Sequence, residues 1–300
     1  MAARERFRRR NLLRRERVFR DRLNPLENYN DDELRHRFRL PRSLILDICT
    51  IVSADIQRGT CRSQALPVQL MVCCVLRFLA TGAIYSVLGD GVRISKSSVF
   101  RSILAVCDIL AHHVRDFVKF PSSAYEVRMV KTGFFEEFRF PNVIGAIDGT
   151  HIPIEPPKDR EYLYVNRKGF HSLNIQIVVD SKMKILSLVD GYPGRSHDSY
   201  IFECSYLAMK LRQKQIPGDG WLLGDSGDPQ RIYLMTPVAN PRTREEIAYN
   251  TCHARARSIV ERAIGLLKAR FRCLSRTSGA VRIRNLERVT NIKSAVILPS

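Results

Sequence analysis

The chain has 300 residues, 45% of them hydrophobic, and includes 14 Phe and 10 Tyr, enough for a packed core and too many for wholesale disorder. Its formal net charge is +19 at pH 7, which an enzyme that acts on small neutral metabolites does not need. This charge favours a polyanionic partner, because Lys and Arg neutralise phosphates. An anionic membrane is the alternative, but no apolar run approaches the ~20 residues that span a bilayer. We therefore expect nucleic acid as the partner and no membrane.

Residues 1–24 form an arginine-rich tail in which apolar residues such as Phe7, Leu12 and Phe19 separate the basic ones. This pattern fits a basic amphipathic helix, a nuclear-import signal or an arm on the DNA backbone, and a solvated basic tail is the plainer alternative. No apolar signal-peptide core follows the basic start.

Residues 25–138 have helical patterns. Asp31 or Asp32 is the predicted cap of one helix, Pro41 opens the next, and Pro67 and Gly82 bound a third.

Farther along, "AIYSVLGDGVRISKSSVFRSIL" predicts a short helix, a turn at residues 89–91 and a second helix opened by Ser95. Lys96, Ser98 and Arg101 at its start make this pair a candidate helix-turn-helix, although many helical hairpins share the outline.

From residue 139 to residue 300 the sequence pattern changes, and strand-like apolar segments alternate with helical ones. We expect strands at 141–148, 173–180, 184–194, 220–227 and 231–237, and helices at 198–215 and 253–274. Three consecutive strands followed by helix-linked strands predict an α/β fold, a mixed sheet flanked by helices. The eight cysteines form no C-x-x-C pair, which argues against a zinc site and fits buried thiols in a reducing, intracellular compartment.

Four acidic residues occupy informative places. Asp148 and Asp225 each end an apolar strand, Asp198 opens a helix, and Glu261 lies among apolar residues of the last helix. Asp148 beside Gly149 could be a simple turn residue, and Asp198 a helix cap. Two strand-end aspartates and a helical glutamate can, however, meet at one edge of a sheet, where their oxygens suit Mg²⁺ or Mn²⁺ and phosphodiester chemistry.

Asp225 and Glu261 have 35 residues between them, a spacing that resembles the DDE transposases and integrases. The segments "AIDGTHI", "GYPGRSHDSYIF", "WLLGDSGDP" and "ARSIVERAIGLLKARFRCL" are similar to the PIF/Harbinger superfamily over roughly residues 25–295. The resemblance implies a ribonuclease-H-like DDE domain at 139–300, with Asp148, Asp225 and Glu261 as catalytic metal ligands and Asp198 as a fourth ligand. It also implies a separate Myb-like DNA-binding partner protein.

The last helix carries a second similarity. Arg257, Glu261 and Lys268 have the spacing of the R-(3)-E-(6)-K signature of bacterial DDE transposases, which places all three on one helix face. Arg257 and Lys268 would then contact DNA phosphates, while a plain intrahelical Arg257–Glu261 pair is the alternative. His151 and His197 flank the site as expected substrate or second-sphere contacts rather than ligands.

Two departures from the superfamily bear on activity. Asp228 stands where Tyr usually follows "GDSG", and "VTNIKSAVILPS" replaces the usual continuation of the closing helix. The sequence thus predicts a metal-dependent nuclease of transposase descent that hydrolyses DNA phosphodiester bonds in the nucleus, with the cytoplasm as a further compartment. The alternative is a catalytically weak or inactive DNA-binding adaptor that keeps the fold. A metal-dependent phosphatase would fit the carboxylates but not the charge.

Overall fold

The computed structural model describes residues 22–56, 65–278 and 290–291, so nearly all of the predicted arginine-rich tail lies outside the described residues. The N-terminal part is helical, as expected. Its helices are α2 (Pro25–Asn28), α3 (Asp31–Phe38), α4 (Arg42–Asp55), α5 (Val68–Thr81), α6 (Tyr85–Val92), α7 (Lys96–Phe117) and α8 (Ala124–Phe138). Among the described residues, no helix combines the length and apolar character needed to cross a membrane.

The start of α3 corrects a sequence prediction. Neither Asp31 nor Asp32 is the cap; Asn30 accepts a hydrogen bond from the Glu33 amide, and the Glu33 carboxylate accepts one from the Asn30 amide. Asn caps a helix as well as Asp does, and the two aspartates instead lie in the first turn, where negative charge stabilises the helix dipole.

The turn between α6 and α7 also differs from the prediction. Residues 89–91 lie inside the last turn of α6, and the turn itself is formed by Arg93, Ile94 and Ser95. A Cβ at Gly89 would lie 2.5 Å from the carbonyl oxygen of Ile94, so glycine lets the chain pass close to α6 rather than forming the turn.

The two helices keep the outline of a helix-turn-helix. Ser95 caps α7 as predicted, and α6 packs against α7. Lys96 and Arg101 are exposed at the start of α7. Contact of this segment with DNA stays a prediction.

The C-terminal part contains one five-stranded sheet. Its strands are β1 (Val143–Pro153), β2 (Ser172–Val179), β3 (Ile185–Pro193), β4 (Trp221–Leu223) and β5 (Leu234–Met235), in the order β3-β2-β1-β4-β5. The first three strands are antiparallel neighbours, whereas β4 runs parallel to β1 and β5 parallel to β4. This mixed sheet after a helical region confirms the predicted ribonuclease-H-like fold class.

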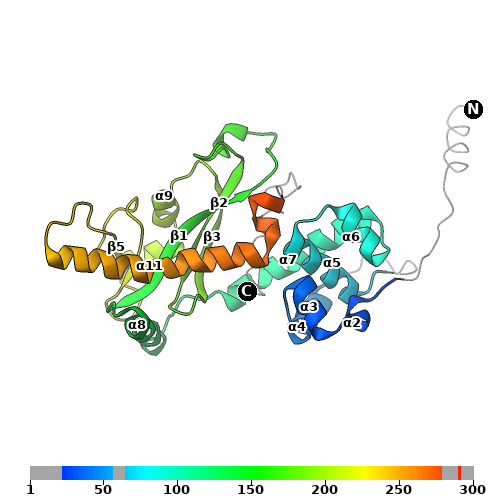
Figure 1. The fold of residues 1–300 in the computed structure, drawn as a ribbon, viewed down its shortest axis with the longest axis horizontal. Helices are drawn as coiled ribbons and strands as arrows, with labels where there is room; N and C mark the ends of the chain where they lie inside the picture. Colours follow the sequence, from blue (N-terminus) through cyan, green and yellow to red (C-terminus); the bar gives the residue numbers. More distant parts are fainter. Residues whose placement is uncertain (1–21, 57–64, 279–289, 292–300) are drawn as a thin grey trace, which may run out of the picture.

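Helices cover both faces of the sheet (Figure 1). On one face α8 and the long helix α11 (Arg244–Arg270) share a buried cluster with β1 and β2, and on the other α9 (Asp198–Glu203) and α10 (Tyr206–Arg212) do so. The single helix predicted over 198–215 is therefore two helices, because Ser205 caps a new start at α10. The last helix begins at Arg244 rather than 253, with Thr243 and Glu246 forming a capping box.

β1 continues past Asp148, which corrects the prediction that the strand ends there. Asp148 pairs with Ile177, and pairing with β2 continues to Pro153. The parallel partner β4 stops earlier, opposite Ala146. Asp148 thus lies within a strand but just beyond the end of its neighbour, where one edge of β1 is no longer covered by β4.

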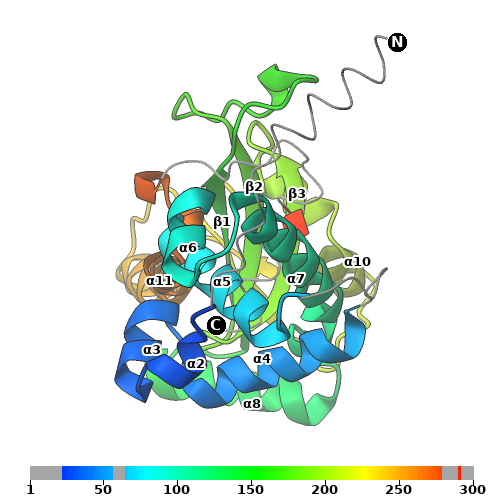
Figure 2. The same ribbon diagram turned by 90° about the vertical axis from the view of Figure 1, so that its right-hand side faces the viewer.

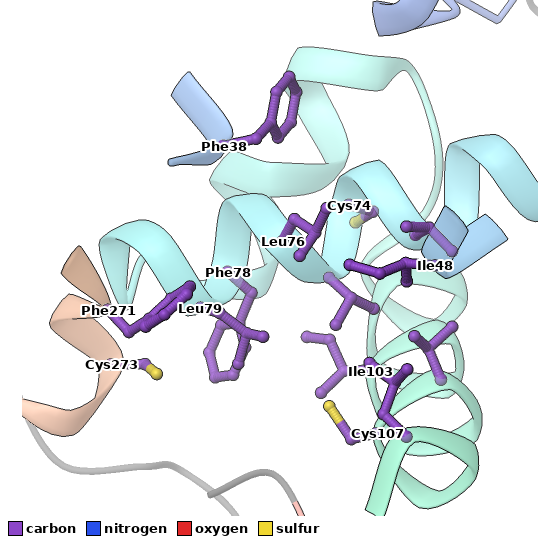
Figure 3. Close-up of a cluster of buried hydrophobic side chains, with 14 of the residues drawn as sticks. Phe38, Ile48, Cys74, Leu76, Phe78, Leu79, Ile103, Cys107, Phe271 and Cys273 are labelled. Atoms are coloured by element: carbon purple, nitrogen blue, oxygen red, sulfur yellow. The ribbon is translucent and has the colours of Figure 1, made fainter. Parts of the chain in front are cut away.

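The helical region and the sheet share one hydrophobic core. After α11, Phe271 and Cys273 are buried in one cluster with residues of α5 and α7, and Figure 3 shows them beside Phe78 and Leu79 of α5. Ile152 of β1 belongs to the same cluster. In the view of Figure 2, α2–α6 lie in front of the strands. The predicted domain boundary between residues 138 and 139 stays a prediction. Helix α8 ends at Phe138, on the N-terminal side of this boundary, and packs on the sheet.

Candidate active site

Asp148 faces α11 from the middle of β1. Its partner Ile177 belongs to the cluster that α11 helps to form, and paired residues of antiparallel strands project to the same face. Arg257 of α11 donates from Nη2 to Oδ1 of Asp148 at 3.0 Å. A guanidinium therefore compensates the charge of a side chain that is only 21% exposed.

Arg257 also binds Glu261, one helical turn farther along α11. Its Nη1 donates to Oε1 of Glu261 at 2.5 Å. Arg257 consequently holds together two carboxylates from different elements, one on a strand and one on a helix. Its Nε is buried without a hydrogen-bond partner, so this donor of the guanidinium is unsatisfied beside the carboxylates.

Lys268 fixes the same face of α11 to β1. Its Nζ donates to Oγ1 of Thr150 at 2.6 Å and to the carbonyl oxygen of His151 at 3.1 Å. Burial lowers the pKa of Lys268, as does the nearby Lys168, whereas Asp148 raises it. The predicted helix face of Arg257, Glu261 and Lys268 thus lies along β1 beside Asp148. The Arg257–Glu261 pair within the helix, the alternative interpretation, also forms and belongs to the same cluster.

Asp225 does not end a strand as predicted, because β4 stops at Leu223 and the predicted strand over 220–227 is shorter, so Asp225 lies in the loop that follows. Its Oδ1 accepts hydrogen bonds from the amides of Gly227 at 2.8 Å and Asp228 at 3.1 Å. No hydrogen bond joins it to Asp148 or Glu261 among the interactions of the described residues. The structure therefore joins Asp148 and Glu261 through Arg257, whereas Asp225 is held by its own loop.

Asp228, whose direction the sequence left open, turns inward. Its Oδ2 accepts a hydrogen bond from the amide of Asp225 at 3.1 Å and lies so close to Gly224 that a Cβ there would be 2.6 Å away. The pKa of Asp228 is raised to about 6, chiefly by burial and also by the negative charges of Asp225 and Asp198, against the lowering effects of the hydrogen bond from the Asp225 amide and of Arg257. The acidic cluster therefore includes Asp228 in addition to the three carboxylates of the expected triad.

Asp198 approaches β1 from the opposite face. Located at the first residue of α9, it accepts a hydrogen bond from Nδ2 of Asn174 at 2.6 Å. A Cβ on Gly149 would lie 2.2 Å from its Oδ1, so only glycine at this position leaves room for the carboxylate. Asp198 therefore lies behind the strand from Glu261, although its charge acts on both Asp148 and Asp228.

Asn174 and Gln176 are members of this arrangement that sequence reasoning missed. Both are almost fully buried on β2, and Gln176 donates from Nε2 to the backbone oxygen of Asp198 at 3.1 Å. The signal was present in "SLNIQIVV", where Ser172, Asn174 and Gln176 alternate with apolar residues and so share one face of a buried strand.

The two flanking histidines differ in their surroundings. Nδ1 of His151 lies 3.1 Å from Oγ of Ser172, and burial lowers the pKa of His151. His197 is exposed and is the N-cap residue of α9 without a capping side-chain hydrogen bond. Neither contacts the Asp148–Arg257–Glu261 cluster through a hydrogen bond among the described residues.

The donor chemistry of the cluster fits a hard divalent cation. The pKa of Asp148 is raised to about 6, chiefly by burial and also by the charges of Asp198 and Glu261, while Arg257 acts to lower it. Crowded carboxylate oxygens of this kind are the ligands that Mg²⁺ and Mn²⁺ prefer. As the side chains of the described residues lie, however, no three Asp, Glu, His or Cys side chains are grouped closely enough to hold a metal ion.

A comparison with protein families finds a match over residues 147–298 to the family described as DDE superfamily endonuclease. This segment contains every carboxylate of the candidate site.

Individual relatives extend the similarity to the helical region. The protein named "Putative nuclease HARBI1" of Rattus norvegicus is 32% identical over 256 residues, which are 85% of this chain and 73% of the relative, and the Homo sapiens protein of the same name has the same values. "Protein ALP1-like" of Arabidopsis thaliana is 27% identical over 79% of this chain and 63% of its own length. No solved structure matches the chain significantly.

Proposed function

The chain belongs to the DDE superfamily endonucleases, and on that premise we propose that it is a divalent-metal-dependent nuclease that hydrolyses DNA phosphodiester bonds at the cluster around Asp148. One observation carries this proposal: Arg257 bonds both Asp148 and Glu261, so a strand and a helix far apart in the sequence bring two acidic residues of the expected triad together.

Each residue of the cluster has a separate task in this proposal. Asp148, Asp225 and Glu261 would hold the metal, with Asp198 acting from behind β1. When bound, the ion would activate a water and stabilise the leaving 3′-oxygen. Arg257 and Lys268 would contact oxygens of the DNA backbone, so that the scissile strand lies along the face of α11.

The test is nicking of a supercoiled plasmid in Mg²⁺ or Mn²⁺. We expect Asp148→Ala and Glu261→Ala to lower the nicking rate by more than about a hundredfold, because loss of a ligand costs at least as much as loss of a ligand's supporting contact. Binding of the same DNA should change little. Asp47→Ala, which removes an exposed carboxylate on α4, is the matched control and should keep the rate. Full nicking by Asp148→Ala would refute the site.

A second candidate function is an adaptor that binds DNA without turnover. It is favoured by the position of Arg257, which already neutralises Asp148 and Glu261, and by the engagement of Asp225 with its own loop. A wild-type protein that binds DNA but nicks it no faster than Asp148→Ala would decide for this function.

We further propose nuclear localisation and a separate DNA-binding partner protein of the Myb-like class. The name of one Arabidopsis thaliana relative, 26% identical, describes an antagonist of LIKE HETEROCHROMATIN PROTEIN 1, which supports an adaptor role in chromatin for a protein of this fold. Affinity capture of the tagged full chain from nuclear extract, followed by mass spectrometry, would test both the compartment and the partner.

A further inference from the structure

A cavity of about 270 Å³ lies in the helical region, between α2, α3, α5 and α6. These helices occupy the end of the molecule away from β5 and the start of α11 (Figure 1). Two arginines, Arg37 of α3 and Arg77 of α5, line it together with Tyr29. The remaining walls are largely apolar and include Phe38 and Leu88. The cavity is therefore an apolar pocket with cationic groups at one side.

Both arginines are held in place. The guanidinium of Arg37 lies over the ring of Tyr29, 4.3 Å from its centroid. Arg77 donates from Nη1 to the backbone oxygen of Arg37 at 2.8 Å. These contacts hold the two guanidinium groups at the wall of the cavity, and such fixed positions lower the entropy that a ligand must overcome on binding.

This cationic group has no counter-charge within the described chain. None of the ion pairs between described residues includes Arg37, Arg39 or Arg77. Arg39 does not line the cavity, although its charge acts on Arg77. Burial lowers the pKa of Arg77, and the charges of Arg37 and Arg39 lower it further. Half-buried like charges without an anion are unfavourable, so the pocket is built for a negative ligand.

We propose that this pocket binds a phosphate group carried on an apolar or aromatic unit, such as a nucleotide. A phosphate offers several oxygens to guanidinium groups that approach from different elements, whereas one carboxylate is satisfied by a single bidentate arginine. The volume is near the lower end of small-ligand sites, about 300 Å³, so it suits one phosphorylated unit rather than a long chain. Leu88 and Phe38 would cover the carbon part of that unit.

The site is independent of the proposed nuclease function, because it shares no residue with the Asp148 cluster. The phosphate could come from a free nucleotide or from the DNA backbone. The test therefore uses two probes with the full chain: thymidine 5′-monophosphate, with thymidine as the uncharged comparison, and a short DNA duplex, both measured by calorimetry at fixed salt.

The variants are Arg77→Gln and Arg37→Gln, with Arg35→Gln as the matched control. Arg35 is exposed on the same helix as Arg37 and does not line the cavity. If the monophosphate binds wild type and thymidine does not, each pocket variant should weaken it at least about tenfold, the effect of one lost charge-assisted hydrogen bond. Arg35→Gln should leave this affinity unchanged.

The outcomes separate the two sources. Loss of monophosphate binding in the pocket variants means that the pocket takes a free phosphorylated unit. No monophosphate binding, together with weaker duplex binding in Arg77→Gln and Arg37→Gln but not in Arg35→Gln, means that it takes a backbone phosphate. Equal behaviour of all three variants toward both probes would overturn the proposal. Should one pocket variant fail to fold in a thermal melt, the other still decides.

Discussion

Arg257 makes the side-chain contacts that connect the strand and the helix of the candidate site. It binds Asp148 and Glu261 and acts to lower the pKa of both Asp148 and Asp228, while its Nε is buried without a hydrogen-bond partner. A guanidinium with fixed planar donors can meet two carboxylates at once, which a flexible ammonium does less well. The same residue is therefore suited both to holding the acidic residues together and to binding a phosphate when the substrate arrives.

At residue scale, Asp228 offers the sharpest test. Because its inward charge faces Asp225, Asp198 and Arg257, it should strengthen metal binding and repel the scissile phosphate. Charges about 4 Å apart near a protein surface interact by ~4 kcal/mol, so the effect should be measurable. We expect Asp228→Tyr to raise the nicking rate and to weaken Mn²⁺ affinity, the latter by calorimetry.

Asp228→Asn is the control for this change, because it removes the charge but keeps an oxygen that can accept the amide hydrogen of Asp225. If only the Tyr variant changes, size rather than charge explains the result. If neither variant alters nicking or Mn²⁺ affinity, the inward carboxylate has no part in the chemistry.

At the scale of elements, local signals fixed the ends of several helices. Gly82 adopts φ 66° after α5, and Ser95 caps α7, both as their residue types predict. The end of β1 could not be read in this way, because Thr150 and His151 break the apolar pattern while β2 still supplies hydrogen-bond partners. Strand length depends on a neighbour that is remote in sequence, whereas a helix cap depends on residues three positions away.

One contact between elements predicts a dependence of stability on pH. His113 of α7 approaches Asp55 at the end of α4, with Nε2 and Oδ2 2.7 Å apart, and Asp116, with Nδ1 and Oδ2 3.2 Å apart. The hydrogen bonds to Asp55 and Asp116 raise the pKa of His113. A raised histidine pKa stabilises the folded state below the ordinary value near 6.5, and this contribution is lost as pH rises through the folded value.

We therefore expect His113→Gln to lower the melting temperature at pH 6 and to matter less at pH 9. The effect should be small, since the pair is partly exposed to solvent. His36→Gln, an exposed histidine on α3, serves as the control in the same thermal melts. An equal decrease at both pH values would show that the imidazolium charge contributes nothing.

For the whole molecule, the shared hydrophobic cluster connects the helical region to the helix that carries the candidate site. Phe271 follows directly on α11 and is fully buried in the cluster that also contains residues of α5, α7 and β1. The helix that carries Arg257, Glu261 and Lys268 is thereby anchored at one end in the N-terminal helices. The sequence shows that Phe271 is apolar, but it does not show that this side chain packs on α5 and α7, because those helices are remote in sequence.

The distribution of charge is the other property of the whole molecule, and it predicts how DNA affinity depends on salt. Residues 1–21 contain nine arginines and three acidic residues. If the tail lies on the DNA backbone, each phosphate contact that is lost should reduce the slope of log affinity against log salt by about 0.9.

Removal of residues 1–21 keeps Arg22, which donates to the backbone oxygen of Ala65, and should flatten the slope. A variant with the nine arginines replaced by Gln keeps the length and removes the charge, so it should flatten the slope equally. Fluorescence anisotropy over a series of salt concentrations measures all three proteins. Unchanged slopes in both variants would assign the phosphate contacts to the folded part, where Lys96 and Arg101 of α7 and Lys268 of α11 would be the next residues to replace.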